Sequence, residues 1–412
     1  MKNLVFGLVA VFAASAVATP AVTSVSVSAG EDGIVFVSYS LADAPAVVTF
    51  DVRTNGVSIG GAAFGCVTGE VNQLVTSSGT HSFVWNSLVG TAPVAAQDVL
   101  DGGAKVVVTA WSPDAPPDYL VVDLTSGTNF WFYESEEALP GGLLANPVYR
   151  TTMLVMKYVA AKDVTWSGLS ASDSKCHDIT LESDYYIGVF ELTQSQWFIF
   201  NKSTTPNFGA PAAMRPMEKL AYNPIRNGSV SGTAANASYF YPEDPSPDSY
   251  LGLLRARTGL AFDLPSEAQW EFACRAGTNN SHWNDGTSTS TRCPGRTKED
   301  GQETAEVGSY PRSKWGTYDM HGNVYEWCLD WFQEYPSGGW TGGEKGVVNA
   351  DGANTINGVN GTTRVRRGGC YVWASGGNEM SGQRDSYDPA TRANFNGCRL
   401  ACPARPYLFN ID

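Results

Sequence analysis

Histidine is scarce in this sequence, and no long hydrophobic run follows its first residues. Its 412 residues include four histidines, His81, His177, His282 and His321. They are scattered and show no H-x-x-x-H spacing, so a dedicated iron site is not expected. After the N-terminus no apolar stretch approaches the roughly 20 residues that a membrane-spanning helix needs. The sequence therefore predicts no membrane span after the N-terminal segment.

The sequence also contains fewer basic than acidic residues. The chain has 27 Lys and Arg against 41 Asp and Glu, which gives a formal net charge of -14 and a pI near 4.7. The one basic cluster, residues 364–367, is too short to offset this charge. Because an acidic surface repels phosphate backbones, nucleic acid is not an expected partner.

The N-terminus has the features of a secretory signal peptide. Lys2 supplies a short basic region, residues 4–17 are apolar, and residues 16–18 form an Ala-Val-Ala cleavage pattern. We expect residues 1–18 to be removed on export, and the protein to be secreted or periplasmic. A membrane anchor is the weaker alternative, because the apolar run is shorter than a spanning helix.

Export changes the interpretation of the eight cysteines. Disulfides persist in oxidising compartments, whereas cytosolic cysteines more often bind metals or take part in catalysis. Cys66 is the only cysteine in the first third of the chain. Unless Cys66 bonds across domains, at least one cysteine further along the chain is unpaired. Cys370 follows the Arg-Arg-Gly-Gly of residues 366–369, and it is either a working thiol or part of the scaffold.

The chain divides into two regions of different composition. Residues 22–124 contain short, alternating β-branched runs separated by turn signals such as TNG and DGG. This pattern predicts an antiparallel β-sandwich similar to fibronectin-III or immunoglobulin-like modules. Residues 125–146 mix proline, glycine and acidic residues and are predicted to form a linker. Residues 147–405 are rich in glycine, tryptophan and asparagine, which is typical of a loop-rich domain.

Two helices are expected in the second region. Thr193 and Gln196 form a Thr-x-x-Gln capping box, and Ser266 and Gln269 form the equivalent Ser-x-x-Gln box. Gly277 can adopt the left-handed conformation that ends the second helix. Two capped helices in a large, loop-rich domain favour an α+β fold over a doubly wound sheet.

Four sequence blocks in the second region occur in a characteristic order. Together they resemble the formylglycine-generating enzyme family, also called sulfatase-modifying factor domains. The resemblance covers residues 147–405 and implies a large, irregular α+β domain similar to C-type lectins. The blocks are YYIGVFELTQSQW (185–197), FDLPSEAQWEFACRAG (262–277), VGSYPRSKWGTYDMHGNVYEW (307–327), and RVRRGGCYVW (364–373) followed by NGCRL (396–400).

The resemblance implies an oxidase that converts a sulfatase cysteine to formylglycine, with copper held by two cysteines. Thiolates suit this role because soft sulfur ligands stabilise Cu(I). Counted without gaps from the Arg-Gly-Gly motif, the two positions are Trp373 and Asn378 here, and neither side chain can replace a thiolate, so copper is not expected. A shifted loop could still rebuild a soft site from Cys370 with Cys398 or Cys402. A disulfide between such cysteines is the favoured interpretation.

The DMHGNVYEW segment, residues 319–327, is the strongest remaining candidate site. Its Gly-Asn turn can direct main-chain carbonyls towards the flanking carboxylates, which is the all-oxygen environment that calcium prefers. The alternative is that Asp319 caps a turn and Glu326 pairs with a nearby arginine. The resemblance implies a structural calcium ion bound by Asp319, Gly322, Val324 and Glu326, and a less well matched calcium site that includes Asp300.

A polar, turn-rich segment between residues 367 and 400 suits an adaptable binding surface on a rigid scaffold. The first hypothesis is therefore a calcium-stabilised module without oxidase chemistry that binds a peptide, protein or glycan. The alternatives are a formylglycine-generating oxidase with atypical copper ligation, and a structural envelope module docked through its sandwich. The residues predicted to bind the ligand are Trp373, Ser375, Asn378, Gln383 and Arg384.

Overall fold

The computed structural model describes residues 19–59, 66–89, 94, 96–126, 129–168, 177–201, 204–208, 214–228, 244–278, 294–332, 362–374 and 379–406. The predicted signal peptide, residues 1–18, lies outside these segments, as do Ser375 and Asn378 of the predicted ligand site. No helix within the described segments is long and apolar enough to cross a membrane.

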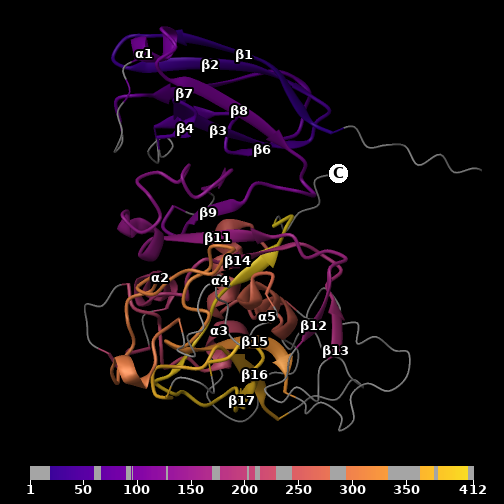
Figure 1. Ribbon diagram of the computed structural model, residues 1–412, viewed down its shortest axis with the longest axis vertical. Coiled ribbons are helices and arrows are strands. Elements are labelled where there is room, and N and C mark those ends of the chain that lie inside the picture. Colours follow the sequence, from indigo (N-terminus) through magenta and orange to yellow (C-terminus); the bar gives the residue numbers. More distant parts are fainter. Residues whose placement is uncertain are drawn as a thin grey trace, which may run out of the picture.

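The N-terminal region is a β-sandwich (Figure 1). One sheet has the strand order β1-β2-β7-β5, and the other has the order β4-β3-β6 with β8 paired to β3. Every pair is antiparallel, so the predicted antiparallel sandwich is confirmed. The elements are β1 (Ala21–Ala29), β2 (Ile34–Ala42), β3 (Ala46–Thr54), β4 (Val57–Ser58), β5 (Val67–Gly69), β6 (Gln73–Val75), β7 (Gly79–Asn86), α1 (Ala96–Leu100) and β8 (Lys105–Trp111).

Side chains from both sheets fill the interior of the sandwich. Burial alternates along β2, as expected for a strand with one face on the core. The ring of Phe50 on β3 lies with its centroid 5.0 Å from that of Phe83 and 5.5 Å from that of Trp85, both on β7. These aromatic contacts join the two sheets, because β3 and β7 belong to opposite layers.

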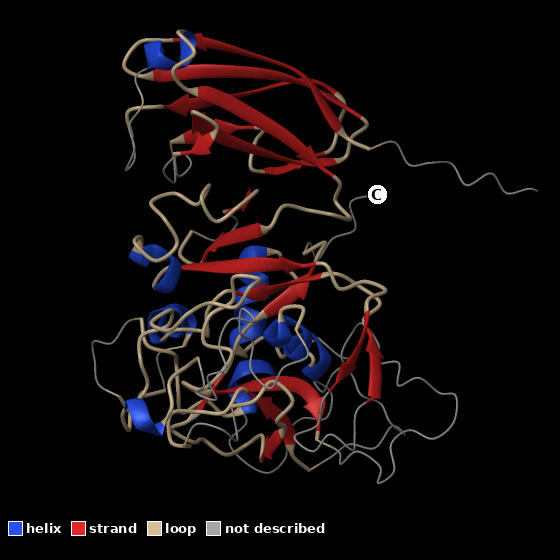
Figure 2. Cartoon of the chain, in the orientation of Figure 1, coloured by secondary structure: helices blue, strands red, loops and turns tan. Residues whose placement is uncertain are grey.

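A five-stranded antiparallel sheet lies next to the sandwich (Figures 1 and 2), with the order β10-β9-β11-β14-β19. Two of its strands come from before residue 147. β9 lies within the range predicted as sandwich and β10 within the predicted linker, and β9 pairs with both β10 and β11. The bounds are β9 (Tyr119–Asp123), β10 (Phe130–Tyr133), β11 (Met153–Val159), β14 (Tyr185–Gly188) and β19 (Ala401–Pro403).

Short helices and two smaller sheets complete the second domain (Figure 2). One sheet pairs β12 with β13, and the other has the order β17-β16-β15-β18. The combination of mainly antiparallel sheets and separate helices confirms the predicted α+β class. The remaining elements are the 3-10 helix η1 (Pro147–Arg150), β12 (Thr165–Gly168), β13 (His177–Thr180), α2 (Gln194–Phe200), α3 (Tyr222–Arg226), α4 (Tyr250–Thr258), α5 (Glu267–Arg275), the 3-10 helix η4 (Lys298–Asp300), β15 (Tyr325–Trp331), β16 (Arg364–Arg367), β17 (Asp385–Tyr387) and β18 (Asn396–Gly397).

Both predicted capping boxes are present. Thr193 caps α2, and its main-chain N–H donates to the Gln196 side chain at 2.9 Å. Ser266 caps α5 in the same way, through Gln269 at 2.9 Å. The left-handed turn that ends α5 begins one residue earlier than predicted, because Ala276 itself has a φ of 46°.

The sandwich and the second domain are in direct contact. Arg53 on β3 forms an ion pair with Glu134, which follows β10. The main-chain N–H of Phe132 on β10 donates to the carbonyl of Asn72 at 3.1 Å. Val47 of the sandwich also belongs to the same buried apolar cluster as Leu120 of β9. The two regions therefore share part of one core.

Candidate functional site

The DMHGN turn is held in a conformation that requires its glycine. Asp319 and Gly322 have φ values of 57° and 85°. A Cβ atom added to Gly322 would lie 2.2 Å from the carbonyl oxygen of Arg296, which no side chain can tolerate. The chain then enters β15, whose second residue is Glu326. This path buries the carboxylate of Asp319 and brings it near that of Glu326, and burial first, then the neighbouring charge, raises the pKa of Asp319.

Glu326 is fully buried and already has donors on both carboxylate oxygens. The Arg399 guanidinium donates to Oε1 at 2.8 Å and to Oε2 at 3.0 Å, and the Trp270 indole N–H donates to Oε2 at 2.6 Å. Arg399 also donates to the carbonyls of Gly188 and Tyr318, at 2.8 and 2.7 Å. The structure therefore contains the pairing of Glu326 with an arginine that was the alternative to calcium ligation.

Asp319 has a buried oxygen without a donor. Its Oδ2 accepts the main-chain N–H of Gly308 at 2.6 Å, whereas Oδ1 has no hydrogen-bond partner. Burial raises the pKa of this carboxyl to about 6, although the Gly308 N–H and Arg399 act against the shift. A buried carboxylate oxygen without a hydrogen-bond donor destabilises the folded state, so we expect either a cation or a proton at this oxygen.

A third buried acid, Glu191, faces the same cluster and was not identified from the sequence. Its carboxylate accepts the Asn323 amide at 2.6 Å and the Val324 main-chain N–H at 3.1 Å. Burial raises its pKa well above the usual value, and the nearby Asp319 and Glu326 add to this effect. The signal available in the sequence was a single acidic residue within the apolar stretch of residues 187–192.

The negative charge of this cluster favours a bound cation, but not every residue predicted to bind it is available as a ligand. The Arg399 guanidinium pairs with Glu326, its charge also acts on Glu191 and Asp319, and Asp319 Oδ1 has no hydrogen-bond partner. Glu326 does not fit as a ligand while Arg399 and Trp270 occupy its oxygens. Within the described segments no group of three or more His, Cys, Asp or Glu could hold a metal ion. A cation here would thus need main-chain carbonyls as additional ligands.

Asp300, the residue predicted for the less well matched calcium site, caps its own helix. Its Oδ2 accepts the main-chain N–H and the hydroxyl of Thr297, both at 3.1 Å. These bonds form the capping box of η4. The carboxylate thus has a local structural role in this structure.

The predicted ligand-binding residues lie in different environments. Trp373 is 49% exposed, and its carbonyl accepts the main-chain N–H of Lys298 in η4 at 3.0 Å. Gln383 is partly buried, and its side-chain amide donates to the Arg384 carbonyl at 3.1 Å. Arg384 instead points inward and binds both carboxylate oxygens of Glu267, at 2.6 and 2.7 Å. Of the three predicted residues that the structure describes, Trp373 is therefore the most available to a ligand.

Cys370 is a buried, protonated thiol. Its side chain is 1% exposed, and burial raises its pKa to about 12. The disulfide predicted between Cys370 and Cys398 or Cys402 is wrong for this structure, because all three cysteines are free. Cys398 and Cys402 instead pack as apolar side chains in the largest buried cluster. A buried neutral thiol is a poor nucleophile and a poor metal ligand.

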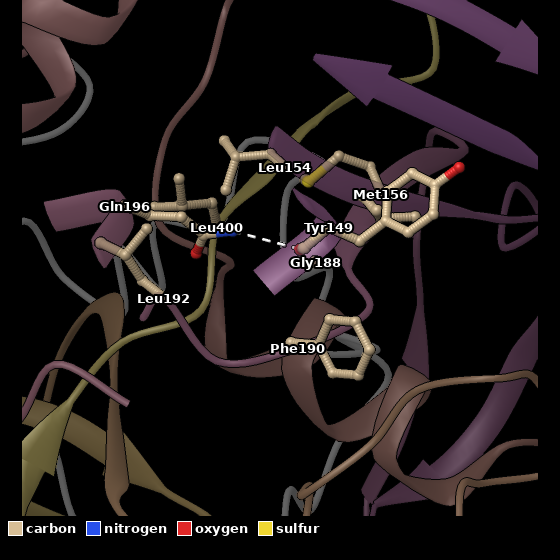
Figure 3. Close-up of a pocket in the computed structure, with 9 residues that line it drawn as sticks. Tyr149, Leu154, Met156, Gly188, Phe190, Leu192, Gln196 and Leu400 are labelled. Carbon is tan, nitrogen blue, oxygen red and sulfur yellow. Dashed lines mark hydrogen bonds between the residues drawn. The ribbon is translucent and has the colours of Figure 1, made fainter. Parts of the chain in front are cut away.

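A small cavity lies between η1, β11 and β14 (Figure 3). Its volume of about 10 Å³ is near the lower limit for one water molecule. Beside it, the side-chain amide of Gln196 donates to the Tyr149 carbonyl at 3.3 Å. The cavity is too small for a substrate. Its lining residues are Tyr149, Leu154, Val155, Met156, Gly188, Phe190, Leu192, Gln196 and Leu400.

The family assignment follows from a comparison with protein-family models. The model of the sulfatase-modifying factor enzyme 1-like domain matches residues 160–404, which is more than half of the chain. The chain belongs to the sulfatase-modifying factor family. This match extends over the buried carboxylate cluster, Cys370 and Trp373, so all of these features lie within the family domain.

Individual relatives of the family match smaller parts of the chain. The chain is 28% identical over 205 residues to Chaperone protein LppX of Paenibacillus barcinonensis, covering 42% of this chain and 71% of that protein. It is 37% identical over 122 residues to the formylglycine-generating enzyme of Streptomyces coelicolor, covering 26% of this chain and 36% of the enzyme. Among solved structures, Treponema denticola variable protein 1 is 24% identical with a TM-score of 0.45, covering 61% of this chain and 96% of that one. Because the alignment spans about a third of the Streptomyces enzyme, that enzyme's activity is not transferred by similarity alone.

Proposed function

We propose that this member of the sulfatase-modifying factor family is an exported binding module that lacks the copper-dependent oxidase chemistry. The observation that carries the proposal is the identity of the two copper positions, which are Trp373 and Asn378. An indole and an amide offer no thiolate, and Cu(I) needs soft ligands. The signal-peptide pattern of residues 1–18 supports export.

The state of Cys370 supports the same proposal. Its thiol is almost completely buried and stays protonated at neutral pH, because burial raises its pKa to about 12. Copper ligation would require it to lose its proton in an apolar environment. The oxidase alternative is favoured by the similarity to formylglycine-generating enzymes, but it would need Cys370 and a second cysteine to move into a shared site.

The ligand surface is proposed to centre on Trp373. Trp373 is 49% exposed and its main chain is bonded to η4, whereas most large apolar side chains of the described domain are buried. An exposed indole offers a flat apolar face that stacks on peptide side chains or sugar rings. Ser375 and Asn378 follow it in the chain and would supply polar contacts. The ligand class proposed is a peptide, protein or glycan.

Calcium is proposed to stabilise the domain at the buried carboxylate cluster. Asp319 would bind through its bare Oδ1, and the carbonyls of Gly322 and Val324 would complete an oxygen environment. The ion would offset the surplus negative charge that Asp319, Glu191 and Glu326 create around Arg399. Its role would be structural, since the free energy of ion binding offsets part of the entropy cost of ordering the irregular backbone.

A binding assay tests the proposed surface. The full chain is screened against peptide and glycan arrays, and hits are compared between the wild type, Trp373→Ala and Leu88→Ala. Leu88 is the matched control, because it is 53% exposed but lies in the sandwich. We expect binding to weaken at least about tenfold in Trp373→Ala and to persist in Leu88→Ala. Equal binding by all three proteins would contradict the proposal.

A further inference from the structure

One sheet of the sandwich has a free edge. In an immunoglobulin-type sandwich, a four-stranded sheet faces a three-stranded sheet whose middle strand has a neighbour on both sides. The sheet β1-β2-β7-β5 matches the four-stranded sheet, and β3 and β8 match the first two strands of the other. Within the described segments β8 pairs only with β3, because the next strand of the chain, β9, pairs with β10 and β11 instead.

The hydrogen bonds of β3 show which groups of β8 face this edge. β6 and β8 both pair with residues 47–48 of β3, so they lie on opposite edges of that strand. Phe50 of β3 donates its main-chain N–H to the side chain of Asn72, just before β6, at 3.0 Å. The main-chain groups of Phe50 therefore point away from β8, and its cross-strand partner Val108 forms a non-hydrogen-bonded pair with it.

Val108 consequently directs its N–H and C=O away from β3. Pairs with and without hydrogen bonds alternate in an antiparallel sheet, so Val106 and Ala110 do the same. Val107 and Thr109, which lie between them, bond to β3. In the described part of the chain, Val106, Val108 and Ala110 have no main-chain hydrogen bond on their outer side. An edge strand with such free groups is a template for another strand.

Little charge protects this edge, and an apolar side chain next to it is uncovered. Proteins usually blunt free edges with charged residues, proline or bulges. β8 has one charged residue, Lys105 at its first position, no proline, and a continuous register with β3. The neighbouring strand β1 carries Val25, which lies opposite the buried Tyr39 and so faces the interior of the sandwich, yet is 39% exposed. A strand added beside β8 would pack against this face of β1.

The last described residues lie near the end of β8. Arg405 forms an ion pair with Asp114 at 2.5 Å, and Asp114 is the third residue after Trp111, where β8 ends. Residues 407–412 follow in the sequence and read YLFNID. The alternation of Tyr, Phe and Ile with other residues favours a strand. Six extended residues span about 20 Å, and β8 itself spans about 23 Å, so the segment is long enough to pair along most of β8.

We propose that residues 407–412 form the missing strand and pair antiparallel with β8. The segment starts near the end of β8 and runs back along it, which makes the pair antiparallel. Its two aromatic side chains and its isoleucine then face the interior and cover Val25. Asp412 lies opposite Lys105, where the opposite charges attract. The cross-strand pairs are Tyr407 with Ala110, Phe409 with Val108, and Ile411 with Val106.

This strand adds a second connection between the sandwich and the second domain, besides the chain that runs from β8 to β9. β19, which ends shortly before the segment, belongs to the five-stranded sheet, so the segment links that sheet to β8. The segment involves neither Trp373 nor the carboxylate cluster, so its test is independent of the proposed binding function. The competing occupants of the edge are a strand from a second copy of the chain and a strand from another protein.

Hydrogen exchange at single amides tests the pairing. The full chain is compared with a shortened chain that lacks residues 407–412. We expect the amides of Val106, Val108 and Ala110 to exchange at least about tenfold faster in the shortened chain, because they lose their hydrogen-bond acceptors. The amide of Val107 bonds to β3 in both proteins and is the internal reference. If the three rates relative to that of Val107 are the same in both proteins, the proposal is wrong.

An engineered disulfide tests the register and identifies the occupant. Val108→Cys combined with Phe409→Cys places two thiols on directly opposed residues, whose Cα atoms should lie about 5.5 Å apart, within bonding range. We expect this double variant to form a disulfide within one chain under mild oxidation. The control is Val107→Cys combined with Phe409→Cys, because Val107 faces the other side of the strand. A disulfide that links two chains, or no more disulfide than in the control, would overturn the proposal.

Discussion

Glu326 and Arg399 form an ion pair in which both side chains are 0% exposed, with oxygen-to-nitrogen distances of 2.8 and 3.0 Å. They are 73 residues apart in the chain and join β15 to the segment before β19. Arg399 also donates to carbonyls of the chain next to β14 and of the turn before β15. This single guanidinium thus connects the five-stranded sheet to the carboxylate cluster.

Removing the acid of this pair is expected to be strongly destabilising. Glu326→Ala leaves Arg399 buried without its carboxylate, which typically costs about 3–5 kcal/mol. Urea unfolding of the full chain measures the loss. The control is Arg405→Ala, because the Arg405–Asp114 pair is 61% and 75% exposed, and its removal should change stability by about 0.5 kcal/mol or less. Similar, small effects of both variants would refute the structural role of the buried pair.

Calcium should raise the melting temperature through Asp319. In the wild type we expect a higher melting temperature in calcium than in chelator, since binding to the folded state alone stabilises it. Asp319→Asn should show the same melting temperature in both conditions. Asp123→Asn is the control, because the carboxylate of Asp123 accepts hydrogen bonds from Thr125 and Ser126 and lies outside both predicted calcium sites. If calcium does not change the melting temperature of the wild type, the proposed calcium site is wrong.

The Asp319 cluster also predicts a pH dependence in the absence of calcium. Its folded pKa of about 6 lies above the usual 3.8, so the folded state binds the proton more tightly than the unfolded state does. The contribution of Asp319 to stability is then fully present below about pH 4 and is lost as the pH rises to about 6 and above, by up to ~3 kcal/mol. Asp319→Asn should lose this decline. Denaturant unfolding of both proteins in chelator across this range would show it, and parallel profiles would contradict it.

The burial of the free cysteines predicts how their thiols react with an alkylating reagent. Cys370, Cys398 and Cys402 are buried and unbonded. All three should resist alkylation in the folded protein and react fully after unfolding without reductant. Peptide mass mapping of the protein isolated from an oxidising compartment measures this. Recovery of a disulfide-linked peptide that contains Cys370 would show that the predicted bridge forms after all.

Local features of the fold could be predicted from the sequence, whereas distant pairings could not. The capping boxes at Thr193 and Ser266 involve residues three positions apart, so short-range chemistry determines them. The alternating strands of the sandwich are equally local. β9 is a short apolar run within the range predicted as sandwich, but it pairs with β10 and with β11 of the second domain, and strand pairing depends on the surrounding tertiary structure.

The candidate site shows the same division. The sequence pattern identified Asp319 and Glu326 because they flank one turn. Their neighbours Glu191 and Arg399 come from distant segments, and no spacing rule links these to the turn. The partner of Arg384 is likewise Glu267, 117 residues away. The expected disulfide was wrong because compartment and cysteine number do not determine which thiols lie within bonding distance.

Oxidation of a peptide tests the absence of oxidase chemistry most directly. The full chain, supplied with Cu(I), a thiol reductant and dioxygen, is incubated with a sulfatase-derived peptide that contains the target cysteine, and the product is identified by mass spectrometry. We predict that the cysteine remains unconverted, because Trp373 and Asn378 stand at the copper positions and Cys370 is a buried thiol. Formation of formylglycine by the wild type, and its loss in Cys370→Ala, would contradict the account and establish the oxidase.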